Sequence, residues 1–224
     1  GIVGVNIGAN KDSADRTHDY ELGVRRFAAL ASYLTVNISS PNTPGLRSMQ
    51  ARDQLAELLS RVVAARADAA GKPPIFLKIA PDLAEAELED IAAEVSEKRI
   101  DGLIVSNTTL SRQGLRDANS GEAGGLSGKP LFERSTIVLA KMRKLLGPDA
   151  VIIGVGGVNS AETALDKIRA GADLVQLYTG MIYAGPGLPA RIVSGMIDFV
   201  GREGLPSIRD LRDSDLYLWA AKPL

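Results

Sequence analysis

Short apolar runs alternate along the chain with segments of helical length. The runs are continuous and rich in Val, Ile and Leu, which is typical of parallel strands buried on both faces. In the segments between them, such as 82–98 and 160–169, apolar residues recur at helical spacing, and Ser160 is placed as an N-cap. This order predicts a parallel sheet with covering helices, either open or closed into a barrel. The six strands are predicted near residues 2–7, 33–38, 74–79, 101–105, 151–154 and 173–177.

Two strand ends near the C-terminus, at residues 153–157 and 177–180, are rich in glycine. Either could simply be a tight turn. In (β/α)8 TIM barrels, however, the loops after strands seven and eight often bind phosphate through backbone N–H groups. If these are strands seven and eight, the chain supplies strands 3 to 8 of a barrel. Because it also starts with Gly1 and not Met, residues 1–224 are expected to form one barrel domain that is incomplete at its N-terminus.

The composition excludes several kinds of site. The 224 residues are 45% apolar and 24% charged, with a net charge of −1, so the charge balance gives no reason to expect a nucleic-acid partner. The chain has no cysteine, which excludes disulfides, thiolate metal sites and cysteine nucleophiles. The single histidine, His18, lies at a predicted helix start, where we expect a structural role. No Ser–His pair or histidine metal cluster is therefore expected.

Polar residues mark the ends of four predicted strands. Asn6, Asn37 and Asn107 each follow an apolar run, and Lys78 lies inside one. A single Asn at such a place is often a turn former. Lys78 cannot be buried cheaply without an anionic partner, which is either Asp82 in an ion pair or a ligand that carries or develops negative charge.

The segment 37–43, with sequence NISSPNT, offers hydroxyls and carboxamides but no carboxylate, imidazole or thiol. It is either a polar turn before a helix or a site for a neutral, amide-rich ligand. The strand ends carry no Asp/Glu pair, which disfavours glycosidase chemistry. A phosphate cradle, a cation and amide donors together fit a flavin mononucleotide, FMN. Its phosphate would bind the two Gly-rich strand ends, and Lys78 would face the N1/O2 edge of the ring. The Gly-rich stretch 111–129 is expected to be an active-site loop.

Seven blocks follow one another along the chain, at residues 5–11, 37–43, 78–83, 106–109, 124–130, 154–157 and 174–179. In content and order they resemble the dihydroorotate dehydrogenases. Together they lie within about residues 3–200, while residues 201–224 match poorly and receive no function. In this resemblance, Ser40 falls at the position where the class 2, quinone-dependent members have a serine base. Class 1 members have a cysteine there. A chain without cysteine fits only class 2.

The resemblance implies FMN-dependent oxidation of (S)-dihydroorotate to orotate in de novo pyrimidine (UMP) biosynthesis, with electrons passed to a quinone. Ser40 would remove the C5 proton while the C6 hydride goes to flavin N5, and Thr43 would help to relay the proton. Substrate contacts are expected from Asn37, Asn42, Asn107 and Thr108. Flavin contacts are expected from Asn6, Asn37, Lys78 and Ser106, and phosphate contacts from Gly128, Gly157, Tyr178 and Thr179.

The resemblance also implies an N-terminal segment, absent here, that forms a quinone tunnel and rests on a membrane. The expected location is peripheral, on the cytoplasmic face of a bacterial inner membrane or, alternatively, on the mitochondrial inner membrane, and a monomer is expected. Three rival hypotheses remain: another flavin barrel such as a class 1 or dihydropyrimidine-type enzyme, a non-redox isomerase or lyase of sugar phosphates, and a degenerate barrel kept as a binding module.

Overall fold

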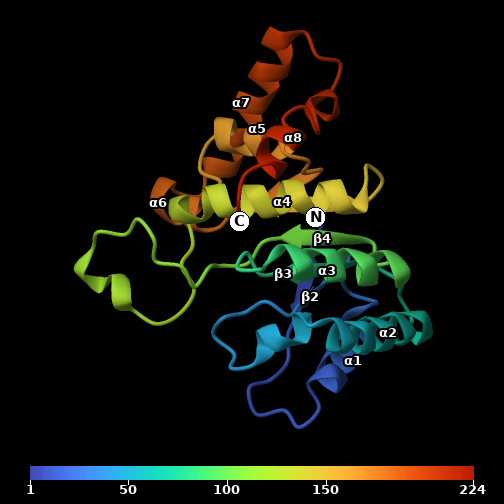
Figure 1. Cartoon of the computed structure of the whole chain (residues 1–224). Helices are drawn as coiled ribbons and strands as arrows, with labels where there is room; N and C mark the ends of the chain where they lie inside the picture. The colour runs from blue at the N-terminus through green and yellow to red at the C-terminus, as the bar shows by residue number, and fades with distance from the viewer.

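The computed structural model describes all residues, 1–224, as one open sheet of six parallel strands with helices on its outer side (Figure 1). Each strand pairs with the next one along the chain, in the order β1 to β6, so the fold is a partial (β/α)8 barrel. The strands are β1 Gly4–Ile7, β2 Tyr33–Asn37, β3 Ile75–Ile79, β4 Gly102–Val105, β5 Val151–Val155 and β6 Leu174–Gln176. All six predicted strands are confirmed to within two residues at either end.

The helices connect successive strands and then continue past β6. The α-helices are α1 Arg16–Phe27, α2 Arg52–Asp68, α3 Glu85–Glu97, α4 Phe132–Leu146, α5 Ala161–Arg169, α6 Thr179–Ala184, α7 Leu188–Glu203 and α8 Leu216–Ala220. Short 3-10 turns are η1 Leu46–Gln50, η2 Ala118–Gly121, η3 Lys129–Leu131 and η4 Ile208–Leu211. None of these helices combines the length and the apolar composition needed to span a bilayer.

Successive side chains of each strand point to opposite faces of the sheet, as pleating requires. In β3, Leu77 and Ile79 point outward into a core of 33 buried residues beneath the helices. Phe76 points inward, where it packs with Ile104 and Ile153 of the next two strands. The alternation therefore gives the barrel wall an apolar outer face and leaves the inner face to the site.

The expectation that every strand is buried on both faces is wrong for β1 and β6. Both are partly exposed, and Leu174 of β6 has 56% of its surface accessible. The reason is topological, because each of these two strands has a paired neighbour on one side only.

The helix boundaries follow local capping. Ser160 caps α5, as predicted, by accepting a hydrogen bond from the Thr163 N–H at 3.3 Å. The helix predicted from residue 82 begins three residues later, at Glu85. There the Glu87 side chain accepts from the Ala84 N–H at 2.8 Å, and Asp82 is bound elsewhere.

Candidate active site

Three polar side chains lie on the inner face near the carboxyl ends of neighbouring strands. Asn37 of β2 is in register with Lys78 of β3, and Asn6 of β1 is in register with Thr35 of β2. Because Asn37 and Lys78 alternate with outward-facing Val36 and Leu77, the pleat turns both toward the barrel interior. This is the end of a parallel barrel that carries active sites.

A cavity of about 390 Å³ opens on this face. Its lining includes five residues predicted for the site: Asn6, Asn37, Ser40, Lys78 and Asn107. A second cavity, of about 330 Å³, brings together the other strand ends. Eight predicted residues line it: Lys78, Ser106, Asn107, Thr108, Gly128, Gly157, Tyr178 and Thr179. The two cavities share Lys78 and Asn107, so they adjoin and offer one elongated site.

Lys78 is the cation between the two cavities. Its side chain forms no hydrogen bond or ion pair within the chain, and burial alone lowers its pKa. The alternative ion pair with Asp82 is wrong. Asp82 accepts from Arg47 at 2.8 Å, from the Leu110 N–H at 2.9 Å and from the Thr109 hydroxyl. An uncompensated, mostly buried ammonium favours a ligand that brings or develops negative charge.

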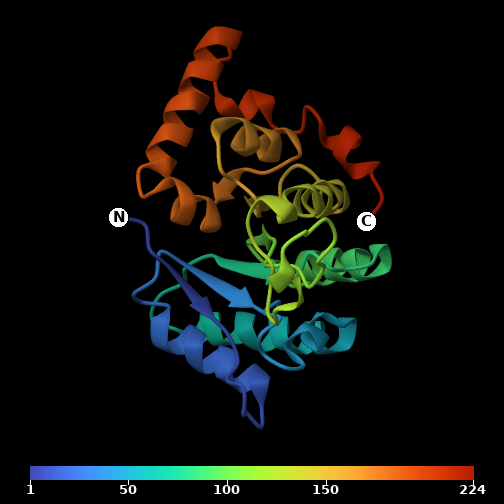
Figure 2. The same cartoon turned by 90° about the vertical axis from the view of Figure 1, so that its left-hand side faces the viewer.

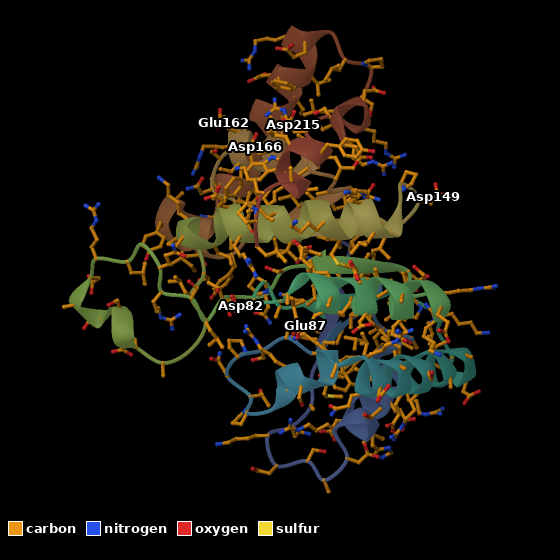
Figure 3. All side chains as sticks on the ribbon, in the orientation of Figure 1. Asp82, Glu87, Asp149, Glu162, Asp166 and Asp215 are labelled. Carbon is orange, nitrogen blue, oxygen red and sulfur yellow. The ribbon has the colours of Figure 1, made fainter.

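Burial by itself would raise the pKa of Asp82, but the hydrogen bonds from Thr109, Leu110 and Arg47 outweigh it and lower that pKa. Figure 3 labels Asp82 where β3 leads into α3, close to the loop that follows β4. Asp82 thus fixes that loop. Its carboxylate is bound to Arg47, Thr109 and Leu110 and forms no ion pair with Lys78.

The asparagines of the site bind one another. Asn107 Nδ2 donates to Asn37 Oδ1 at 3.2 Å and to Ser39 Oγ at 3.1 Å. Asn107 Oδ1 accepts from the Thr108 N–H at 2.8 Å. The Nδ2 group of Asn37 has no partner in the chain, which leaves its donors to a ligand. This network joins the ends of β2 and β4 and gives the asparagines more than a turn-forming role.

Ser40 lines the first cavity, and its Oγ accepts a hydrogen bond from the Asn42 N–H at 3.2 Å. A donor at this oxygen favours its anionic form. Asn42 and Thr43 line neither of the two cavities, and no hydrogen bond joins Thr43 to Ser40. Their predicted contacts to substrate and proton therefore stay predictions.

The C-terminal part of the stretch 111–129 packs against the loops of the site, while the role of the stretch as an active-site loop stays a prediction. Gly125 packs so closely that a Cβ added there would lie 1.8 Å from Thr108 Oγ1 and 2.8 Å from Pro41 Cγ. Thr109 and Leu126 form an antiparallel bridge at the base of the loop. Figure 2 shows the loop, in yellow-green, in front of the sheet.

The glycines of the second cavity are required by their surroundings. Gly128 and Gly157 have φ angles of +82° and +73°. A Cβ on Gly157 would lie 2.5 Å from Phe132 Cβ, and one on Gly128 would lie 3.0 Å from Thr179 Cγ2. Both glycines therefore combine a left-handed backbone with packing that leaves no room for a side chain, next to Thr179 at the start of α6.

Three structural contributions were missed from the sequence. Arg47 donates to Ser39 O at 3.1 Å and to Thr108 O at 2.8 Å, which ties two site loops together. The buried Tyr20 hydroxyl donates to Asn37 O at 2.6 Å, and burial raises the pKa of Tyr20 to about 12. Gln176, at the end of β6, lines the first cavity. Only Gln176 had a sequence signal, as a polar residue closing an apolar strand.

His18 is exposed and contacts Glu21, as expected for a structural residue.

The fold is a partial (β/α)8 barrel in which a cavity bordered by glycines adjoins a polar cavity, and Lys78 lines both. The family model of dihydroorotate dehydrogenase matches residues 1–200. The chain therefore belongs to the dihydroorotate dehydrogenase family.

Curated relatives carry the name dihydroorotate dehydrogenase (quinone). The protein of Mesorhizobium japonicum is 80% identical over 225 residues, and that of a Chelativorans species is 67% identical over 228 residues. Among solved structures, DHODH from Eimeria tenella in complex with ferulenol is 37% identical, with a TM-score of 0.92 over 96% of this chain. This chain covers 63% of the length of each of the two curated relatives and 62% of that structure.

Proposed function

We propose that the full-length protein oxidises (S)-dihydroorotate to orotate and passes the electrons to a quinone, as a class 2 member of its family. The observation that carries this proposal is the pair of adjoining cavities, one with a backbone cradle and one with amide donors, with Lys78 between them. The names of the relatives supply the substrate and the acceptor.

FMN is the proposed cofactor, and when bound it supplies the acceptor for the hydride. The fit rests on two features of the chain. Gly128, Gly157 and Thr179 leave backbone N–H groups available to a phosphate, with Tyr178 beside them, and the ammonium of Lys78 has no partner of its own. Lys78 would hold negative charge at the edge of the ring. Asn6 of β1 shares the first cavity with Lys78, and Ser106, directly after β4, shares the second.

Substrate would lie in the first cavity against Asn37 and Asn107. The free Nδ2 group of Asn37 would donate to a pyrimidine carbonyl or to the carboxylate, while the bonds from Asn107 hold its Oδ1 in place. Asn42 and Thr108 would complete this contact from the loops that border the cavity.

Ser40 would take the C5 proton. A serine without a neighbouring histidine is a weak base, so its proton must have a path away, which Thr43 would provide. The hydrogen bond from the Asn42 N–H to Ser40 Oγ stabilises the charge that develops on this oxygen. Loop 111–129, which packs on Thr108 and Pro41, would keep water from the reacting carbons.

Several finer parts of the hypothesis rest on the resemblance alone. They are a peripheral position on a bacterial inner membrane, contact with that membrane outside residues 1–224, and a monomeric state. The quinone must be reached from the membrane phase in which such acceptors dissolve, which makes a peripheral location the natural one.

Absorbance spectroscopy of the purified full-length protein tests the proposal. A flavin band should be present, dihydroorotate should bleach it under anaerobic conditions, and a quinone should restore it. A protein that stays colourless after reconstitution with FMN would overturn the redox proposal. The alternative, a phosphate-binding isomerase or lyase, would then be favoured.

A further inference from the structure

Lys167, on the inward side of α5, is a fully buried cation with 0% of its surface exposed, and unlike the buried Arg143 it has no ion-pair partner. Its Nζ donates to Ser135 Oγ at 2.6 Å and lies 5.0 Å from the centre of the Phe132 ring. No carboxylate oxygen lies within ion-pair distance. Burial lowers its pKa well below the ordinary value, with no other cause. Such a group is costly unless something compensates its charge.

The contacts of Lys167 lead to the second cavity. Ser135 Oγ, in the first turn of α4, also lies 3.3 Å from Gly156 O and 3.1 Å from Phe132 O. Gly157 follows directly and packs on Phe132, where an added Cβ would lie 2.9 Å from the Phe132 nitrogen. The Ser135 hydroxyl thus connects the ammonium of Lys167 to Gly156, in the loop proposed to bind the phosphate.

No carboxylate of the surrounding elements forms an ion pair with Lys167, and burial is the one cause of its lowered pKa. Asp166, labelled on α5 in Figure 3, is paired with Arg169 of the same helix at 2.9 Å. Charged groups of the other neighbouring elements also pair among themselves, and none contributes to the shift in the pKa of Lys167. These pairs are Arg143–Asp173, Arg212–Asp173, Arg212–Asp213 and Lys222–Glu133.

We propose that Lys167 is the buried counter-charge of the cofactor phosphate, a positioning residue that acts through Ser135 and Gly156. The inference rests on the proposed function, since it requires that FMN binds with its phosphate at Gly157 and Thr179. A dianion in this cradle stabilises the ammonium form of Lys167. By reciprocity, the ammonium then strengthens binding of the dianion.

Comparing FMN with riboflavin isolates this effect, because riboflavin has the same ring without the phosphate. The full-length protein would be stripped of flavin, and dissociation constants would be measured for both ligands. In Lys167→Met, FMN affinity should fall about tenfold, the scale of one unit charge acting across a few residues. Riboflavin affinity should stay within about twofold, since no phosphate is involved.

Lys141→Met is the matched control. Lys141 lies on α4 and is also largely buried, but it pairs with Glu85 at 2.7 Å and donates to Ala220 O. Its loss should leave the ratio of the FMN and riboflavin dissociation constants unchanged. Equal losses for the two ligands in Lys167→Met would make Lys167 a packing residue and overturn the proposal.

Proton uptake on ligand binding distinguishes the two roles of Lys167, because a residue that only packs takes up no proton. Calorimetry in two buffers of different ionisation enthalpy, at about pH 8 where a phosphomonoester is already a dianion, measures the protons taken up on binding. The wild-type protein should take up a fraction of a proton with FMN and none with riboflavin.

This measurement needs no variant, so it decides the matter even if Lys167→Met fails to fold. No uptake with FMN would overturn the proposal. A wild-type protein that binds FMN no better than riboflavin would overturn the proposed phosphate site itself, which is a separate and recognisable result.

Discussion

At the scale of single residues, the positive charge of the site and its proposed proton acceptor belong to different segments. Lys78 carries positive charge and faces both cavities, whereas the residue proposed to move a proton, Ser40, lies in an uncharged loop. The Ser40 oxygen receives one backbone donor and has no ionisable neighbour among its hydrogen-bond partners. If Ser40 acts as the proposed base, its proton has to leave through further hydroxyl groups.

Ser40→Ala should retain flavin but slow its reduction by dihydroorotate about 10²–10⁴-fold, the usual range for a general base. The substitution removes the hydroxyl and leaves the second cavity, where the phosphate is proposed to bind, unchanged, because Ser40 does not line it. Anaerobic stopped-flow absorbance measures the rate. Ser48→Ala is the control, since Ser48 lies in η1 and bonds Gly45 O, and its rate should match wild type. Unchanged reduction in Ser40→Ala would remove Ser40 from the mechanism.

Arg47 joins the loops that carry Ser39 and Thr108 through a planar guanidinium that lysine cannot reproduce. Its nitrogens donate to Ser39 O, Thr108 O and Asp82, three acceptors in different segments. Arg47→Lys keeps the charge but can reach only part of this set. We expect orotate to bind about tenfold more weakly, as loss of a charge-assisted hydrogen bond implies, with FMN affinity unchanged.

The perturbation of the flavin spectrum by orotate measures that affinity. Arg52→Lys is the control, because Arg52 is exposed on α2 and pairs with Asp90 and Glu94 away from both cavities. If Arg47→Lys binds orotate as the wild type does, the two loops keep their positions without the guanidinium.

At the scale of elements, charged contacts lock neighbouring helices outside the site. Arg61 of α2 bonds Glu21 of α1 at 2.9 Å and Asp15 at 3.1 Å. The hydrogen bond from Arg61, followed by that from His18, lowers the pKa of Glu21 from 4.5 to about 2. This cluster joins α1 to α2 beneath β1 and β2.

A carboxylate with a lowered pKa stabilises the fold above its unfolded-state pKa and loses that effect as the pH falls through its folded-state pKa. Glu21→Gln should therefore lower the urea midpoint of the full-length protein slightly at neutral pH, because the pair is partly solvated. The difference from wild type should shrink between pH 4.5 and about 2. A difference that does not vary with pH would assign the effect to packing and not to the charge of Glu21.

The sequence predicts elements well where the signal is local. Each strand was placed from a continuous apolar run, and Ser160 from its position before a periodic segment. The start of α3 was misplaced because Asp82 bonds Thr109 and Leu110, which lie after the next strand. The contacts Arg47–Asp82 and Lys167–Ser135 span 35 and 32 residues. No local pattern encodes such pairs, so the contacts of Arg47 and the buried lysine came from the structure.

At the scale of the whole molecule, the sheet has two free edges. β1 pairs only with β2, and β6 only with β5. Large apolar side chains flank both edges, with Ile2 85%, Val3 60% and Leu174 56% exposed. Unpaired strand edges with apolar neighbours are templates for association with other chains.

A chain of residues 1–224 produced alone should therefore self-associate. Multi-angle light scattering after size exclusion should give masses above that of one 23.6 kDa chain, rising with concentration. Val3→Lys with Leu174→Lys places charges beside both edges, which should reduce association, because edge lysines oppose strand pairing. Lysines at exposed Leu145 and Leu218, away from the edges, serve as the control and should not reduce it. A monomer that unfolds cooperatively would contradict the expectation that the free edges drive association.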